Sequence, residues 1–187
     1  MSGAWNGLLP KSLTVGGVGY KIRSDYREIL DICAAVSDPG FDAQERAFVA
    51  LSILFVNFES MPQEHYKEAV DKCHWFINGG DTPPDGKQPK LMDWGQDFKH
   101  IIAPINRIMG REIRAIKCMH WWTFLSAYME IGDCYFSQIV NIRNKRVQGK
   151  ALDKSEQEFY RKNRSAVDLK TKYTEQDDAA LDGWMGK

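Results

Sequence analysis

The chain has 187 residues, and its 25 Lys plus Arg balance 25 Asp plus Glu, giving a formal net charge of +0. A chain of this length can bury the core of one domain, and a neutral molecule has no long-range attraction for nucleic acid or acidic lipid. The four cysteines are widely spaced and follow no signal peptide, which disfavours a secreted disulfide framework and favours a reducing cytoplasm.

The N-terminal residues predict a β-hairpin over 12–22. Two short runs rich in β-branched residues, 13–15 and 18–22, flank Gly16-Gly17, a dipeptide that accepts positive φ in a tight turn. A helical pattern follows from Asp25, which with Glu28 has the spacing of an N-terminal cap. Its expected core stripe consists of Tyr26, Ile29, Leu30, Cys33 and Val36.

A second helix is predicted to begin at Asp42, with Glu45 three residues later, and to run to Phe58. Its apolar run, residues 47–58, is interrupted by two polar residues and is too short to cross a bilayer. Because apolar side chains occur nearly all round this helix, we expect it to be central and buried.

A third helix should begin near Pro62 and end at Gly79-Gly80. Residues 79–89 hold three glycines and three prolines, so residues 79–92 are predicted to form a flexible loop. The next helix should begin at Asp93, with a kink or a split near Ala103 because Pro104 lacks a backbone donor.

A fifth helix is expected over residues 114–131, a sixth capped by Asp133, and a seventh from Asp153 with Glu156 completing the cap. The sixth should bury Tyr135, Phe136, Ile139 and Val140. The tail 168–187 is polar and weakly periodic. We therefore predict a mainly α protein, with a single domain over 1–167 of six or seven helices and an N-terminal hairpin.

The cysteines and histidines are poor candidates for chemistry. Cys73-His74 and Cys118-x-His120 lack the ligand spacing of a zinc site, and Cys33, Cys73 and Cys118 lie on apolar helical stripes, where a thiol packs as a small hydrophobe. No nucleophile has a base in a suitable position and no phosphate-binding loop occurs. We predict no catalytic residue, metal or cofactor, and no enzymatic activity.

The segment His120-Trp121-Trp122-x-Phe124 is rich in aromatic residues. Base stacking is disfavoured, because residues 118–136 contain no Lys or Arg to hold phosphates. Two interpretations stay open, a core anchor and a partner-binding pocket, with Trp121 and Trp122 as candidates for exposure.

Residues 143–164 carry eight basic and three acidic side chains, a local charge of +5. The commoner meaning of such a run is a solvated face with ion pairs. Phosphate binding and docking of an acidic partner are the alternatives.

A series of motifs, in this order and spacing, resembles the bacteriophage gene-product-fifteen family, whose members belong to the tail modules of phages and prophages of Gram-positive bacteria. The resemblance covers residues 8–169. The motifs are Leu9-Pro10-x-Ser12, Gly17-x-x-Tyr20-x-Ile22, Asp25-Tyr26-Arg27, Trp75-Phe76, Gln96-Asp97, His120-Trp121-Trp122-x-Phe124, Phe136-Ser137-x-Ile139 with Arg143, and Phe159-Tyr160-Arg161-Lys162.

The resemblance implies a tail assembly chaperone that binds the tape-measure protein in the host cytoplasm. The alternatives are a structural component of the tail or head-tail junction, and a DNA-binding accessory protein that uses residues 143–164; a homo-oligomer also stays open. A chaperone of this kind needs an apolar groove beside charged surfaces. The residues we expect to contact the partner are His120, Trp121, Trp122, Phe124, Arg143, Arg146, Arg161 and Arg164.

Overall fold

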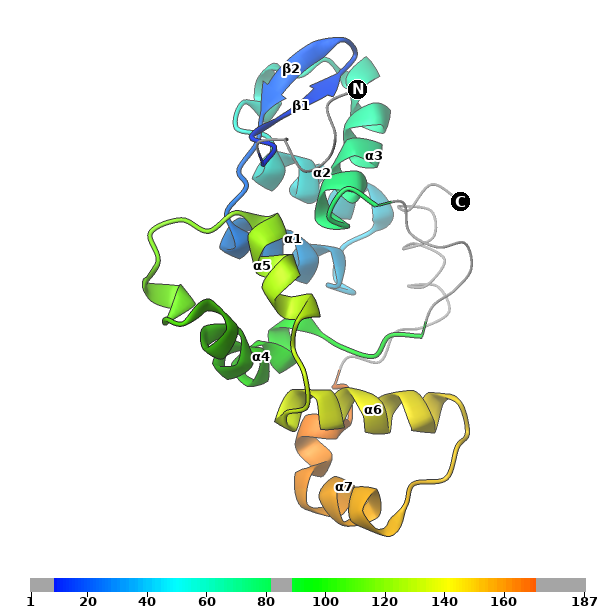
Figure 1. Ribbon diagram of the computed structural model, residues 1–187. Helices are drawn as coiled ribbons and strands as arrows, with labels where there is room; N and C mark the ends of the chain where they lie inside the picture. Colours follow the sequence, from blue (N-terminus) through cyan, green and yellow to red (C-terminus); the bar gives the residue numbers. More distant parts are fainter. Residues whose placement is uncertain (1–8, 82–88, 171–187) are drawn as a thin grey trace. The chain divides into compact units, whose positions relative to one another are not determined.

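The computed structural model describes residues 9–81 and 89–170, and this part of the chain is mainly α, with seven α-helices and one two-stranded hairpin (Figure 1). The predicted fold class is confirmed. The chain divides into two compact units: described residues 9–81 and 117–125 form the first, and 89–116 and 126–170 the second. The single domain over 1–167 stays a prediction. Residues 82–88 of the predicted loop and 171–187 of the tail lie outside the described residues.

The first unit begins with the predicted hairpin. Strands β1 (Ser12–Val15) and β2 (Val18–Lys21) pair antiparallel, with Ser12 opposite Lys21 and Val15 opposite Val18. Gly16 and Gly17 have φ values of 55° and 76°, the left-handed conformation that a tight two-residue turn demands. The inward side chains of Leu13 and Val15 are buried.

Helix α1 (Tyr26–Val36) is capped by Asp25, whose carboxylate accepts from the Arg27 amide. Its buried face differs slightly from the predicted stripe. Ile32 belongs to the core, whereas Leu30 and Cys33 are only half-buried.

Helix α2 (Ala43–Leu54) has the predicted capping box of Asp42 and Glu45, but the prediction that it continues to Phe58 is wrong. Arg23 donates from Nη1 to the carbonyls of Ser52, Ile53 and Phe55. Because these contacts satisfy the carbonyls at the helix end, the chain can leave the helix at Phe55, which is extended and forms an isolated β-bridge with Ile22.

The expected central, buried position of α2 is also wrong. Phe48 is 56% exposed, so one apolar side of the helix faces solvent. Two short 3-10 helices, η2 (Phe58–Ser60) and η3 (Gln63–His65), follow α2. Helix α3 (Tyr66–Ile77) begins four residues after the predicted start at Pro62 and ends just before Gly79 and Gly80, whose φ values are 73° and 94°.

The helix predicted over 114–131 is two separate elements. A 3-10 turn, η4 (Ile113–Ala115), precedes a non-helical stretch, and α5 begins only at Trp121 (Trp121–Met129). The Asp25 carboxylate accepts from the Met119 amide, the Ser24 carbonyl accepts from the Trp121 amide, and Asp25 forms a β-bridge with His120. These partners replace the intrahelical bonds that Met119 and His120 would otherwise make.

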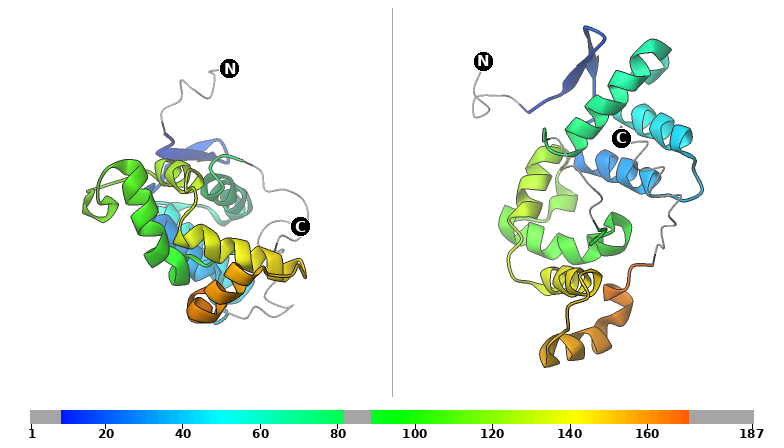
Figure 2. Two further views of the ribbon diagram at one scale, coloured as in Figure 1. Left: turned by 60° about the horizontal axis from the view of Figure 1, so that its bottom comes forward. Right: turned by 90° about the vertical axis from the view of Figure 1, so that its right-hand side faces the viewer.

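The second unit contains α4 (Trp94–Met109), α6 (Tyr135–Val147) and α7 (Lys154–Val167). Helix α4 is not split at Pro104; it continues to Met109 and ends at Gly110, with φ of 66°. The close packing of α6 and α7 as a helical hairpin is visible in Figures 1 and 2. Ile139, Ile142, Ala166 and Val167 form its core.

The predicted start of α7 is confirmed, since Asp153 and Glu156 form a full capping box. The start of α6 differs from the prediction: Cys134 rather than Asp133 is the cap, with Ser137 as its partner. Tyr135, predicted to be buried, is exposed and donates its hydroxyl to Asn163. Across the described part of the chain, no helix is long and apolar enough to cross a bilayer.

Candidate partner-binding surfaces

The aromatic motif is largely a core element of the first unit. Trp121 is 1% exposed, its indole N–H donates to the Ile77 carbonyl at 2.8 Å, and its ring stacks on Phe124 at 5.5 Å. Phe124 in turn stacks on Tyr26 with 4.8 Å between ring centroids. The expectation that Trp121 is exposed is therefore wrong, because its ring and its polar atom both have partners inside the unit.

Trp122 and His120 lie half-buried beside this core. The Trp122 indole donates to the Phe76 carbonyl at 2.8 Å, and its ring lies 5.4 Å from Trp75. His120 Nδ1 accepts from the Trp122 amide at 3.1 Å, which assigns the proton to Nε2, 2.9 Å from the Pro10 carbonyl. Burial lowers the pKa of His120. A partner-binding role for these residues stays a prediction.

The cysteines occupy different environments. Cys73 is buried and burial raises its pKa, so its thiol stays protonated and packs as a hydrophobe. Cys118, predicted to be in the core, is exposed because it lies in the non-helical stretch before α5. In the residues that the structure describes, no group of three or more His, Cys, Asp or Glu is arranged to hold a metal ion.

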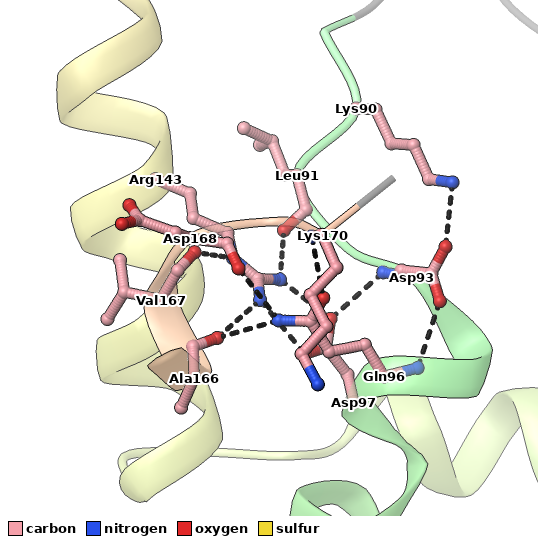
Figure 3. A network of polar contacts seen from close by, with 10 residues as sticks. All are labelled: Lys90, Leu91, Asp93, Gln96, Asp97, Arg143, Ala166, Val167, Asp168 and Lys170. Atoms are coloured by element: carbon pink, nitrogen blue, oxygen red, sulfur yellow. Dashed lines mark hydrogen bonds and ion pairs between the residues drawn. The ribbon is translucent and has the colours of Figure 1, made fainter. Parts of the chain in front are cut away.

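Arg143, one of the expected surface residues, is the centre of a buried polar network in the second unit (Figure 3). Its side chain is 4% exposed and that of Asp97 is fully buried. Nη1 and Nη2 donate to the two Asp97 oxygens at 2.6 and 2.9 Å, a bidentate pair. The guanidinium also donates to the carbonyls of Leu91, Ala166 and Val167. Arg143 is therefore a structural residue.

The network extends through the neighbouring glutamine. Gln96 Nε2 donates to the carbonyls of Ala166 and Asp168, and its side-chain oxygen accepts from the Lys170 amide. Figure 3 shows the start of α4 bound in this way to the end of α7 and to the segment that follows it. The sequence motifs contain Gln96-Asp97 and Arg143 separately, and the fold brings them together. Asp97 lies four residues before Ile101 on the buried face of α4, a position where a carboxylate indicates a buried cation.

The other basic side chains of 143–164 mostly form ion pairs within the second unit. Arg146 and Arg164 both contact Asp168, and the Arg146 guanidinium lies 4.6 Å from the Tyr160 ring centroid. The remaining pairs are Lys145 with Glu156 and Lys162 with Glu158. Arg161 is exposed. This pattern supports the solvated face with charge pairs over a phosphate-binding surface.

An open apolar groove lies in the first unit between α2 and α3, two helices that pack side by side (Figure 1). It encloses about 1000 Å³. Phe48 lines it and its ring meets the Phe58 ring edge to face at 5.1 Å, and the Phe58 ring lies 5.0 Å from the Tyr66 ring. The lining consists of Phe41, Gln44, Glu45, Ala47, Phe48, Val49, Leu51, Gln63, Tyr66, Lys67 and Val70.

The charged side chains that line this groove are Glu45 and Lys67, so its lining is charge-balanced. Glu68 and Asp71 line a separate pocket beside the hairpin. Arg46 of α2 is 2% exposed and donates to the Asp38 carbonyl. The sequence-based prediction missed the groove because it placed α2 in the centre of the fold. The capping box of Asp42 and Glu45 could have corrected this prediction, because two carboxylates indicate that the start of α2 is exposed to solvent.

Comparisons with known proteins support one assignment. A family model described as Bacteriophage Gp15 protein matches residues 5–169. Searches of curated proteins and of solved structures gave no match. The matched span contains both compact units, the aromatic motif and the groove.

Proposed function

The chain belongs to the bacteriophage Gp15 family, and from this premise we propose that it is a non-enzymatic tail assembly chaperone that binds the tape-measure protein in the host cytoplasm. The family places the chain among phage structural and assembly proteins. The tape-measure partner, the chaperone role and the lack of catalytic activity are our proposals.

The observation that supports the chaperone role is the groove between α2 and α3. Phe48 is 56% exposed at the edge of an apolar groove of about 1000 Å³, and a contiguous apolar surface of this kind marks a protein-interaction site. A groove of this kind binds the apolar face of an amphipathic helix. A long, helical tape-measure protein presents such faces before the tail tube encloses it.

Co-expression with the tape-measure gene of the same phage tests the proposal. The wild-type chain should keep the tape-measure protein in the soluble fraction and co-purify with it. Phe48→Glu places a charge in the groove and should abolish both effects, whereas Val147→Glu, at an exposed apolar residue of α6, should abolish neither. A tape-measure protein that stays insoluble beside the wild-type chain would count against the chaperone role.

Mass spectrometry of purified virions separates the chaperone from a structural tail component. A chaperone leaves the tape-measure protein when the tube assembles and should be absent, whereas a structural component should be present in stoichiometric amounts. Size-exclusion chromatography with light scattering tests homo-oligomerisation, which stays a prediction.

The DNA-binding alternative has less support. Arg143 is buried, and Lys145, Arg146, Lys162 and Arg164 already contact carboxylates. A phosphate would have to compete with these partners. A gel shift at low salt with duplex DNA should therefore show no complex.

A further inference from the structure

We propose that His120 is a proton-sensitive latch that joins the segment before β1 to the start of α5. The latch is closed when the imidazole is neutral and opens when the imidazole is protonated. It determines how the first unit responds to pH, and it does not depend on which partner the chain binds.

The neutral imidazole caps helix α5. The His120 carbonyl accepts from the amides of Thr123 and Phe124 at 3.0 and 3.1 Å, so His120 is the residue that precedes the first turn. His120 Nδ1 accepts from the Trp122 amide at 3.1 Å. The first amides of a helix have no intrahelical partner, so this ring nitrogen takes the place of the side-chain oxygen that usually caps a helix.

The other ring nitrogen binds the segment before β1. Because Nδ1 is an acceptor, the proton of the neutral ring lies on Nε2, 2.9 Å from the Pro10 carbonyl and 110 positions away in the sequence. The next carbonyl, that of Lys11, accepts from the Ile22 amide at 3.0 Å and closes the open end of the hairpin. One imidazole therefore connects the open end of the hairpin to the first turn of α5.

Protonation breaks this arrangement at Nδ1. An imidazolium donates from both nitrogens, so a second N–H would face the Trp122 amide across 3.1 Å. The positive charge would also lie at the N-terminus of α5, where the helix dipole disfavours a cation. The ring has to turn away from the amide, and because it is rigid, Nε2 then moves away from the Pro10 carbonyl. Both contacts are lost in one step.

The surroundings of the ring favour its neutral form. His120 is half-buried, and it meets the Phe76 ring of α3 at 5.6 Å and the Trp122 ring of α5 at 6.0 Å, both edge to face. Burial lowers the pKa of His120, the Pro10 carbonyl raises it and Lys11 lowers it, and the net change is a decrease. The folded chain therefore takes up this proton at a lower pH than an exposed histidine does.

The charged groups next to His120 do not stabilise an imidazolium. Lys11, from the segment before β1, is itself a cation. Asp25, which precedes α1, forms an isolated β-bridge with His120, but its carboxylate already pairs with the Arg27 guanidinium at 3.2 Å. Helices α3 and α5 contribute the two uncharged rings. The latch is therefore closed at neutral pH and opens as the pH falls through the pKa of the folded chain.

NMR spectroscopy of the whole chain tests the latch. Long-range proton–nitrogen correlation spectra should show the Nε2–H tautomer of His120 at neutral pH. On acidification, the imidazole and the amides of Trp122 and Ile22 should change with one shared midpoint, below the value of about 6.5 for an exposed histidine. A neutral ring protonated on Nδ1 would overturn the proposal, because that nitrogen could not accept from Trp122.

Hydrogen exchange measures the loss of the contacts. Between neutral pH and a pH below the midpoint, protection of the Trp122 and Ile22 amides should fall by about tenfold, the scale of one hydrogen bond. The Val18 amide, opposite Val15 at the turn, should keep its protection. An equal loss at Val18 would mean that the whole hairpin unfolds, and full protection at Ile22 beside a protonated His120 would mean that no latch opens. Either result would overturn the proposal.

Two variants separate the two ring nitrogens. His120→Asn places an acceptor near the position of Nδ1 and should keep the cap of α5 but lose the contact with Pro10. His120→Gln places its amide near the position of Nε2 and should keep the contact with Pro10 but lose the cap. Neither side chain titrates, so the pH dependence at Trp122 and Ile22 should vanish in both.

The variants are compared in a His74→Gln background, which removes the other histidine of the first unit whose pKa burial lowers. Circular dichroism confirms that each variant is folded. PH dependence that persists at the Trp122 amide in either folded variant would assign the effect to another group and overturn the latch.

Discussion

The two compact units satisfy the carbonyls at their helix ends by different chemistry. In the first unit, the indole groups of Trp121 and Trp122 donate to the last carbonyls of α3. In the second, the guanidinium of Arg143 donates to the last carbonyls of α7. The last carbonyls of a helix have no intrahelical partner, so a helix end that packs inside a unit needs side-chain donors.

The difference lies in the charge of the donor. An indole is neutral, so it can be buried in an aromatic core with no counter-ion. A guanidinium is charged, so its burial requires Asp97. The first unit consequently depends on aromatic packing. The second depends on a buried ion pair, and removing either member would leave the other as an unpaired buried charge.

Trp121→Ala should have the largest effect. The substitution removes a ring that is 1% exposed and its donor to Ile77, and should lower the free energy of unfolding by about 3–5 kcal/mol. Urea denaturation followed by circular dichroism measures it. Met129→Ala, in the same helix at a position 73% exposed, should change stability little. A stable Trp121→Ala protein would mean that the first unit does not depend on this ring.

Asp97→Asn should have the second-largest effect and lower the free energy of unfolding by about 3 kcal/mol, because it leaves the buried Arg143 guanidinium without its counter-ion. The double variant Asp97→Leu with Arg143→Met removes both charges but also leaves the carbonyls of Leu91, Ala166 and Val167 without this donor. Its loss of stability should therefore be smaller than the sum of the losses of Asp97→Leu and Arg143→Met measured alone. Chemical denaturation of the single and double variants checks this, with Lys162→Ala, which removes an exposed ion pair, as the control. Additive losses would contradict the assignment of charge burial as the cost.

Acid should weaken the first unit through His74. Burial lowers its pKa from 6.5 to about 4, against an opposing effect of Asp71. As the pH falls, the unfolded chain therefore takes up a proton at His74 before the folded chain does. The stabilisation by neutral His74 is complete above pH 6.5 and is lost as the pH falls towards 4. The free energy of unfolding should decrease by about 2 kcal/mol over this range, after allowance for partial exposure. Unfolding free energies measured across this range should show the loss, and His74→Gln should reduce it.

Asp42→Ala should have a smaller effect than the changes at Trp121, Asp97 and His74, and should lower the free energy of unfolding by about 1 kcal/mol. It removes the capping box at the start of α2, a wall of the groove. Hydrogen exchange should show faster exchange confined to the first turn of α2. An equal increase in the second unit would mean that the two units do not respond separately.

Local signals in the sequence predicted much of the secondary structure. Asp42 with Glu45 and Asp153 with Glu156 mark true helix starts, and Gly16-Gly17 marks the hairpin turn. Each signal involves residues at most three positions apart, so it has the same meaning before and after folding. The family motifs identified the chain's family, which the family match over residues 5–169 confirms.

The tertiary structure decided where helices end and which side chains are buried. Arg23 satisfies the end of α2, and Ser24 and Asp25 hold Met119 and His120 out of the predicted helix. Arginine is usually exposed, but Arg143 can be buried because Asp97, 46 positions earlier in the sequence, neutralises its charge.

The tertiary structure also determined where the groove lies. The sequence by itself determined that α2 is apolar on several sides, and only the packing of α1 and α3 against it determined which side remains exposed. Hydrophobic periodicity reports how much apolar surface a helix has, whereas burial depends on partners that are distant in the sequence.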